Sequence, residues 1–410
     1  MTGPHRHLVG DAESLPPEPI PVPAEAEGAY ALEPPPEPAP VRARLLSAIL
    51  PGAGHVAIGA WGRGMLLLLA WGALLAIVVL GWDRIRRVPA EGTAEDYIAV
   101  ATLVFALAAV WGYALRELVR PARRAPTPGD SQWRIAARLL ARNRLALFGL
   151  GVIVVLYLVA LLAPLIAPYD PIVQRDIVRT GYLPPSAQHW LGTDQFGRDV
   201  LSRIIYGARI SLSIAFVAVA ISITLGTLLG AVAGYLGGRT DAAIMRFTDM
   251  VLAFPRLVLL IMIIALFSPS IPLIVAVLGL TQWPGTARIV RGEVLSLRER
   301  EFIQAARALG MSRTRIILRH LVPNVLAPVI VAATLGIGNT IVLEAGLSFL
   351  GLGVPPPRPS WGNMVADGRQ NLIGAWWVAT FPGLAIVGTV LAFNLLGDGL
   401  RDALDPRLRT

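Results

Sequence analysis

Three ionisable residues lie inside long apolar segments of this sequence, where they could take part in moving ions or solutes through a translocation path. They are Asp249, Arg256 and Glu344. Charged side chains at membrane depth are costly and are functional candidates by default. Asp249 and Arg256 are two helical turns apart, so we expect them to pair or to face a polar cavity. Glu344 falls near the end of its segment, which favours a structural bond to the glycine-rich loop after it over a midplane coupling role.

The sequence contains no arrangement typical of an enzyme active site. His189 and His320 are isolated from any nucleophile or metal-ligand spacing, and neither Gly-x-Ser-x-Gly nor His-Glu-x-x-His occurs. The chain has no cysteine, which excludes disulfides and thiolate metal sites. All 36 basic residues are arginine, so a P-loop, which needs a lysine on the terminal phosphates, is excluded as well. We therefore expect no catalytic residue, no metal site and no cofactor bound by this chain.

The composition is that of a protein with several membrane-spanning helices. Hydrophobic residues make up 55% of the 410 positions and charged residues 15%, whereas soluble domains carry about 25% charged residues. The net charge of +9 is what arginine-rich cytoplasmic loops produce in a membrane protein. Nucleic-acid binding is therefore not expected.

Eight apolar segments have about the length needed to cross the ~30 Å hydrocarbon layer as helices. They cover about 65–80, 97–115, 147–167, 210–235, 241–267, 271–290, 326–347 and 376–396. Pro255 is expected to kink the fifth segment, and Trp283, Pro284 and Gly285 to interrupt the sixth. The pattern predicts an all-α polytopic membrane protein.

The chain divides into four predicted parts. They are a disordered Pro/Glu-rich tail (1–41), an accessory two-span membrane hairpin (42–116), an arginine-rich cytoplasmic linker (117–146) and a six-helix core (147–410). Arginine excess also places the 293–325 loop in the cytoplasm. Both termini are then cytoplasmic, and the loops 168–208 and 348–375 lie outside.

A charged stretch between two apolar segments, Ser296–Pro323, has the pattern of two short helices around a glycine. Ser296 and Glu299 have the spacing of a capping box. Apolar residues at i, i+3, i+4 and i+7 predict one face of the first helix, formed by Phe302, Ala305, Ala306 and Leu309. Gly310 is expected to end that helix in a left-handed conformation, and a second helix to run from near Ser312 and end before Pro323. Such an elbow is either a docking device or a solvated loop without a partner.

Three long motifs resemble one known family. They are HWLGTDQFGRDVLSRIIYGARISLSIAF (189–216), QAARALGMSRTRIILRHLVPN (304–324) and EAGLSFLGLGVPPPRPSWGNMV (344–365). Together they resemble the inner-membrane permease subunit of dipeptide/oligopeptide (peptide/nickel) ABC importers, over about residues 134–408. The resemblance implies a MetI-like six-helix permease core. The first 130 residues lie outside it.

The resemblance also implies a mechanism in which the 304–323 stretch is a cytoplasmic coupling loop that docks into a groove on a separate ATPase subunit. ATP and Mg²⁺ would be bound by that partner. The coupling residues implied are Glu301, Gln304, Ala305, Ala306, Gly310 and Pro323. The family has a glutamate where this chain has Gln304, so Glu301, one turn earlier, is an alternative carrier of the charge.

The outer loops are implied to contact an extracytoplasmic solute-binding protein and a second homologous permease subunit. Their motif residues are Gly192, Thr193, Asp194, Gly197, Arg198, Asp199 and Trp361. Two ATP-binding subunits and membrane lipid complete the implied partners of a multi-pass protein of the cytoplasmic membrane. The implied function is import of di- or oligopeptides or similar small solutes. An ion-coupled secondary transporter and a nickel- or glutathione-type ABC permease are the alternatives, and the residues do not identify the substrate.

Overall fold

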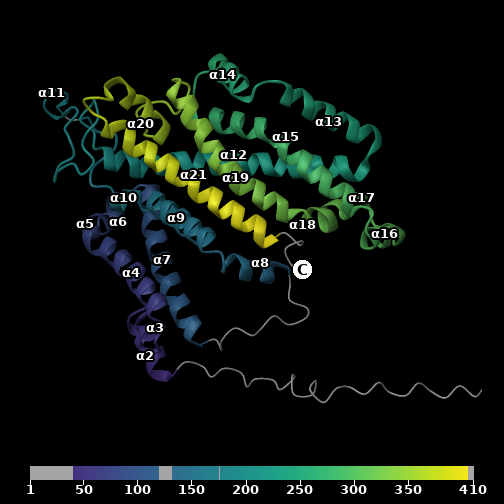
Figure 1. Cartoon of the computed structure of the whole chain (residues 1–410). Helices are drawn as coiled ribbons and strands as arrows, with labels where there is room; N and C mark the ends of the chain where they lie inside the picture. The colour runs from purple at the N-terminus through teal and green to yellow at the C-terminus, as the bar shows by residue number, and fades with distance from the viewer. Residues whose placement is uncertain (1–39, 120–131, 175, 405–410) are drawn as a thin grey trace, which may run out of the picture.

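The computed structural model of the chain describes residues 40–119, 132–174 and 176–404, and all regular secondary structure in these ranges is helical. The predicted disordered tail, apart from its last two residues, and the middle of the arginine-rich linker lie outside the described residues. The helices form two bodies, a hairpin near the N-terminus and a larger core (Figure 1).

The hairpin consists of two long antiparallel helices with short helices at both ends. The long ones are α4 (Trp61–Leu80) and α7 (Ala94–Val119). One end carries α2 (Val41–Ile49) and α3 (Ala53–Ala57), and the other carries α5 (Trp82–Ile85) and α6 (Val88–Glu91). Both long helices are apolar over most of their length, and either is long enough to cross a membrane.

The core is built from the helices that follow. The long ones are α9 (Arg144–Leu161), α12 (Val200–Leu236), α13 (Gly238–Ala253), α14 (Arg256–Leu266), α15 (Ile271–Leu297), α19 (Leu326–Phe349) and α21 (Trp377–Leu404). The short ones are α8 (Gln132–Leu140), α10 (Ala163–Ile166), α11 (Ile177–Thr180), α16 (Glu301–Ala308), α17 (Arg313–Ile316), a π-helical segment Ile317–Leu321, α18 (Val322–Asn324), α20 (Trp361–Gly368) and a 3₁₀ turn Arg369–Asn371.

The centre of the core is the close pair α12 and α15, which small residues allow. Gly226, Gly230 and Gly234 lie four residues apart on the face of α12 that meets α15. A Cβ atom at Gly230 would lie only 2.5 Å from the carbonyl oxygen of Ala287. Such a small-xxx-small stripe is how helices approach each other in membranes, where burial of apolar surface gives little driving force.

The structure confirms one predicted feature of the spans, the bend at Pro255, and contradicts another. The fifth segment is broken at Phe254–Pro255, with 82° between α13 and α14, because the residue before a proline avoids the helical conformation and Phe254 is extended. The interruption predicted at Trp283–Gly285 is wrong: α15 continues through Pro284, whose ring is buried among neighbouring helices. Seven helices can span a membrane within the described residues, or eight if α13 and α14 count as one.

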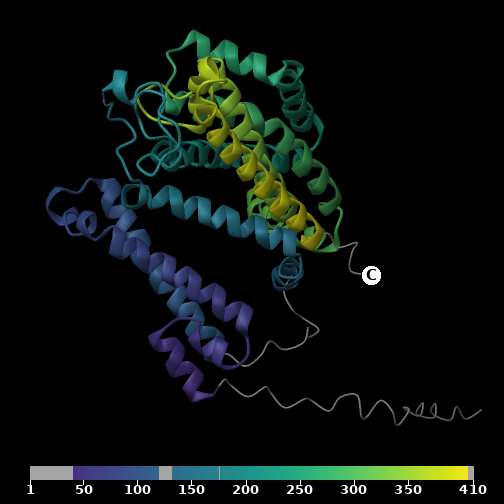
Figure 2. The same cartoon turned by 60° about the vertical axis from the view of Figure 1, so that its left-hand side comes forward.

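The hairpin is attached to the core at one end (Figures 1 and 2). Arg84 Nη1 donates to the carbonyl oxygens of Pro164, Leu165 and Ala167, at 3.2, 3.2 and 2.6 Å. These carbonyls are the free acceptors at the end of α10, where a cation is favoured. Leu74 and Leu103 of the hairpin pack beside these residues against Leu162 of the core.

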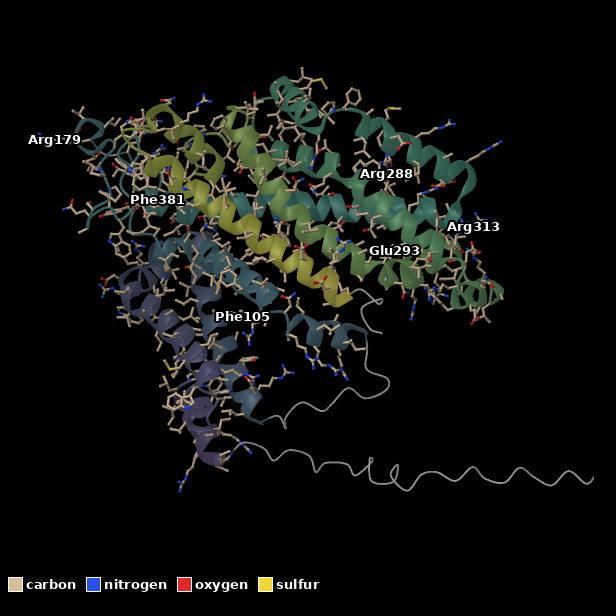
Figure 3. The ribbon with its side chains drawn as sticks, in the orientation of Figure 1. Phe105, Arg179, Arg288, Glu293, Arg313 and Phe381 are labelled. Carbon is tan, nitrogen blue, oxygen red and sulfur yellow. The ribbon has the colours of Figure 1, made fainter. Side chains whose placement is uncertain are left out.

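The two ends of the core carry different structures. The loops around 168–199 and 350–376 gather with α20 at one end, which we call the α20 end, and α16 with α17 projects from the other, the α16 end (Figure 1). Arg179 and Arg313 mark these opposite ends in Figure 3.

Candidate functional site

The segment at the α16 end begins one turn later than its sequence pattern indicates. α15 continues to Leu297, so Ser296 lies inside a helix and the predicted capping box with Glu299 is wrong. α16 begins at Glu301 after Arg300, which makes no side-chain cap. The last turns of α15 pack against α12, where Val294 lies against Gly234. This packing extends α15 through Ser296, which has helix-forming residues on both sides.

The predicted apolar face of α16 divides into two. Ile303 and Ala306 are 0% and 4% exposed and pack into the core against Val290 and Leu321. Phe302 and Leu309 are 42% and 77% exposed and point away from it. Ala305 is exposed on the same side. One apolar side of α16 therefore packs against the core, and the other apolar side is exposed at the surface.

Gly310 ends α16 as expected. Its φ is +73°, and its N–H donates to Arg307 O at 2.9 Å while the Met311 N–H donates to Ala306 O at 3.1 Å. These two bonds form a Schellman motif, which requires a left-handed residue at C′. No atom lies within 4 Å of where a Cβ would be, so the requirement for glycine comes from the backbone alone.

The second half of the segment does not end before Pro323. The Ser312 side chain caps α17 by accepting from Arg315 N at 3.4 Å. The chain then widens into the π-helical segment Ile317–Leu321 and continues as α18, in which Pro323 is the second residue. Pro323 has no N–H to donate, and it follows directly on the π-helical segment, where the hydrogen-bond register of the helix changes. The prediction that the helix stops earlier is wrong.

The two residues considered for charge at this surface lie on the exposed side of α16. Gln304 Nε2 donates to Glu299 O at 3.1 Å, which links the first turn of α16 to the residues just before it. The Glu301 side chain is exposed, and no ion pair involving it occurs in the described part of the chain. Arg307 stacks over the Tyr235 ring at 4.9 Å and ties α16 to α12.

Asp249 and Arg256 do not pair, because the break between α13 and α14 separates them. Asp249 pairs with Arg288 of α15 at 2.5 Å, and both side chains are exposed. Arg256 Nη2 donates to Gln282 Oε1 at 2.9 Å, and Thr340 Oγ1 donates to the same oxygen at 3.0 Å. The three side chains join α14, α15 and α19 within the core.

Arg256 is a cation without a counter-ion. Within the described residues, no carboxylate lies at ion-pair distance from it, and its Nε is buried without a hydrogen-bond partner. A charged group inside a helix bundle is costly unless it is paired. In the described part of the chain, the Arg256 guanidinium is bonded only to the neutral oxygens of Leu278 and Gln282.

Glu344 is fully enclosed near the α20 end. Its Oε1 accepts from Ser348 Oγ at 2.8 Å and from Ser360 Oγ at 3.0 Å. Ser360 is the N-cap of α20 in a capping box with Asn363. The carboxylate thus bonds to the loop after α19, which is the structural placement that the sequence favoured.

The motif at 189–203 forms a buried ionic cluster. Asp194 Oδ2 accepts from Arg198 Nε at 2.7 Å and also pairs with Arg203 Nη1. Asp367, at the end of α20, lies 3.3 Å from Arg203 Nη2. Burial and then the neighbouring Arg203 lower the pKa of Arg198 below its ordinary value, while Asp194 opposes the shift. The cluster joins the loop before α12 to α20.

His189 contacts a carboxylate, a partner that the sequence did not indicate. Its Nδ1 lies 2.9 Å from Asp199 Oδ1, and Asp199 Oδ2 accepts from the N–H and hydroxyl of Ser202. The turn between them is made by Gly192 and Gly197, both at positive φ, and by Thr193, which donates to Thr180 O. Asp199 lies between His189 and Ser202 and caps α12 through Ser202, so the carboxylate holds the loop and the start of the helix together.

All seven motif residues named for the outer loops are buried in the chain, and Asp194 and Trp361 are the clearest cases. Asp194 lies inside the ionic cluster. Trp361 is enclosed, with Nε1 donating to Ile204 O at 3.0 Å and its N–H donating to Ser211 Oγ at 3.1 Å.

Sequence reasoning missed several residues. Gln282, Thr340 and Ser360 are uncharged, and nothing in their local sequence shows what they contact. The stripe Gly226, Gly230 and Gly234 carries a signal that could have been read, the repeated four-residue spacing of small residues inside an apolar segment.

The fold and these sites define a multi-pass membrane transport protein. Residues 226–410 match the family described as binding-protein-dependent transport system inner membrane component, and residues 131–185 match the N-terminal TM domain of oligopeptide transport permease C. The chain belongs to this family of transport permeases, which confirms the resemblance seen in the three motifs.

Curated relatives from other bacteria are similar to this chain over most of their length. The dipeptide transport system permease protein DppC of Alkalihalophilus pseudofirmus is 45% identical over 300 residues, 72% of this chain and 98% of the relative. The di/tripeptide transport system permease protein DppC of Pseudomonas aeruginosa is 43% identical over 291 residues, 69% of this chain and 94% of the relative. A solved inward-facing MetNI methionine ABC transporter has a TM-score of 0.41 at 18% identity, over 50% of this chain and 96% of that one.

Proposed function

We propose that this chain is the permease subunit of an ABC importer for di- or oligopeptides or similar small solutes. The observation that carries the proposal is the 45% identity with a dipeptide permease over 98% of its length. A nickel- or glutathione-type importer is the alternative within the same class. Uptake assays with labelled dipeptide, glutathione and nickel chelate distinguish these substrates.

In this proposal, α16 to α18 form the surface through which a separate ATPase subunit moves the permease. The support is geometric: α16 is anchored by Ile303 and presents Phe302 and Leu309, an apolar patch suited to a groove on a partner. Two such partners would bind and hydrolyse ATP with Mg²⁺, and this chain would itself be non-catalytic. Glu301, exposed beside the patch, supplies the charge that Gln304 lacks.

The arginines at the α16 end place that end in the cytoplasm in our proposal. Arg300, Arg307, Arg313, Arg315 and Arg319 lie between α15 and α18. Both termini would then be cytoplasmic. The loops at the α20 end would face a solute-binding protein and adjoin a second permease subunit.

The polar group of Arg256, Gln282 and Thr340 is our candidate for the translocation path. It supports this role because an unpaired guanidinium inside the bundle can bind the terminal carboxylate of a peptide. Alternating access would expose the group first to one side of the membrane and then to the other.

The test of the proposal is the energy source of uptake. In vesicles that carry the complete importer, orthovanadate should abolish peptide uptake and a protonophore should leave it intact while ATP is supplied. The opposite pattern would favour an ion-coupled secondary transporter. That alternative also requires a carboxylate that titrates during transport. Glu344 would be its candidate, since both serines bond Oε1 and Oε2 is buried with no hydrogen-bond partner among the described residues.

A further inference from the structure

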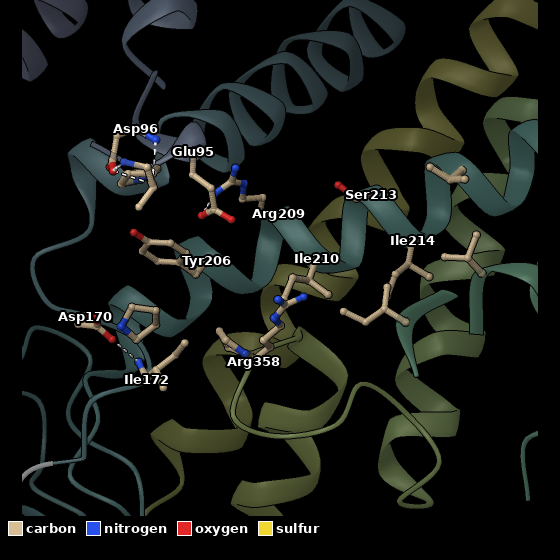
Figure 4. A pocket seen from close by; sticks show the side chains of 17 residues that line it. Glu95, Asp96, Asp170, Ile172, Tyr206, Arg209, Ile210, Ser213, Ile214 and Arg358 are labelled. Carbon is tan, nitrogen blue, oxygen red and sulfur yellow. Dashed lines mark hydrogen bonds and ion pairs between the residues drawn. The ribbon is translucent and has the colours of Figure 1, made fainter. Parts of the chain in front are cut away.

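A cavity lies where the hairpin meets the core at the α20 end (Figure 4). Its volume is about 660 Å³, within the ~300–1,000 Å³ usual for ligand sites. The hairpin contributes Thr93, Glu95 and Asp96, and the core contributes α12, the start of α15 and the two loops at this end. The hairpin lies outside both matched family regions, so the cavity depends on a part of this chain that those models do not cover.

The rim of the cavity carries charges of both signs. Arg358 lines it and has no hydrogen bond or ion pair from its guanidinium within the described residues. Arg209 lines it too, and pairs with Glu95 across the junction at 2.6 Å. Asp96 and Asp170 are engaged only by nearby N–H and hydroxyl groups of their own turns. Three carboxylates against two guanidiniums leave the rim with one excess negative charge.

The cavity becomes apolar with depth along α12. Its lining on this helix runs from Tyr206 and Arg209 to Val217, which spans ~16 Å at the rise of an α-helix. Below Arg209 the lining is Ile210, Ser213, Ile214 and Val217, facing Ile271 and Val275 of α15. A charged rim therefore continues into a slot between two membrane-spanning helices.

We propose that this cavity binds a phospholipid whose headgroup carries a primary ammonium, of the phosphatidylethanolamine class. The phosphate binds Arg358 with help from Arg209, and the ammonium donates to Asp96 and Asp170. One acyl chain lies in the slot beside Val217 and Val275. The lipid neutralises the unpaired guanidinium and fills the junction between the hairpin and the core.

The charges and the slot together select this occupant. An anionic headgroup such as phosphatidylglycerol would meet the carboxylates unfavourably, and a choline headgroup has no N–H to donate to them. A free dipeptide carries the same ammonium and anionic groups but leaves the slot empty, whereas a buried acyl chain contributes about 0.8 kcal/mol per CH₂ group.

Native mass spectrometry of the purified full-length chain tests the site. The protein is exchanged into micelles that contain phosphatidylethanolamine, phosphatidylcholine and phosphatidylglycerol in equal amounts, and the retained lipids are counted. We expect one ethanolamine lipid to be retained preferentially. Arg358→Ala should weaken its retention about fivefold, because a charge-assisted contact is lost. Val217→Trp, which fills the slot, should abolish it.

Arg179→Ala is the matched control, since Arg179 is an exposed arginine at the same end that does not line the cavity. Its lipid retention should equal that of the wild type, and thermal unfolding should show that all three variants are folded. Equal retention of the three lipids by the wild type, unchanged retention in both cavity variants, or displacement of the lipid by soluble dipeptide would each overturn the proposal. The measurement uses the isolated chain, so its result is independent of the transport proposal.

Discussion

Ser360 Oγ donates a hydrogen bond to Glu344 Oε1 at 3.0 Å and so joins the start of α20 to the last turns of α19. The loop between the two helices is proline-rich and has no regular structure of its own. This bond and the one from Ser348 fix where the loop returns to the core. Glu344 is therefore a positioning residue in this structure.

Glu344→Gln should preserve transport, because the amide oxygen still accepts from Ser348 and Ser360 and no proton needs to move. Glu344→Ala should lower the free energy of unfolding by about 1–3 kcal/mol, because two serine hydroxyls lose their acceptor. Uptake and thermal unfolding of both variants check this. A Gln variant that is stable in the membrane but inactive would instead identify Glu344 as a coupling group.

Gly310→Val should uncouple the chain from its ATPase while leaving it inserted. A β-branched residue at φ +73° costs about 1–2 kcal/mol and distorts the Schellman motif that ends α16. The readout is the amount of ATPase that co-purifies with the permease, together with uptake. Gly310→Asn is the control, because asparagine tolerates the left-handed conformation and should behave nearly as the wild type. Full coupling in the Val variant would contradict the role assigned to the elbow.

Leu309→Ala should affect ATPase binding and Ile303→Ala should affect stability, because Leu309 is exposed on α16 and Ile303 is buried. Leu309→Ala should change stability little but weaken ATPase binding, about fivefold, since an exposed apolar contact with the partner is removed. Ile303→Ala should cost about 2–5 kcal/mol of stability, since it empties a packed position in the core. Titration of the ATPase and thermal unfolding measure the two effects. Equal ATPase affinity in wild type and Leu309→Ala would argue against this patch.

Asp194→Asn should strongly destabilise the α20 end. Removing the carboxylate leaves Arg198 and Arg203 buried with only the more distant Asp367, a loss of roughly 3–5 kcal/mol for a broken buried pair. Asp176→Asn is the matched control, because its pair with Arg179 is exposed and should contribute less than about 1 kcal/mol. Thermal unfolding and the membrane yield of the two variants provide the comparison. Similar stability of both would contradict the importance of the cluster.

Arg256→Gln should raise the KM for peptides with a free terminal carboxylate by roughly tenfold, because a charged hydrogen bond contributes about 1.5–3 kcal/mol. Peptides with an amidated C-terminus should be affected less. Arg288→Gln is the control, since Arg288 is an exposed arginine paired with Asp249 on the neighbouring helix. Equal loss with both kinds of peptide would exclude carboxylate recognition by Arg256.

Local signals predicted the helical class, the positions of the spans and the left-handed Gly310. Spans depend on continuous apolar length, and the glycine C′ position depends on the residues of one turn. The misplaced start of α16 and the uninterrupted α15 show where such signals fail. Ser296 and Pro284 both carry local preferences that packing against α12 outweighs.

By itself the sequence determined the number and order of the apolar segments, the absence of a P-loop and the family motifs, because each is a property of neighbouring residues. Only the tertiary structure decided which side of α16 is free, that Arg256 meets Gln282 rather than Asp249, and that Asp194 and Trp361 are buried. These outcomes depend on how helices far apart in the chain cross one another. The bend between α13 and α14, whose angle no local pattern specifies, brings Arg256 to Gln282. The close approach of α12 to α15 helps to position α16.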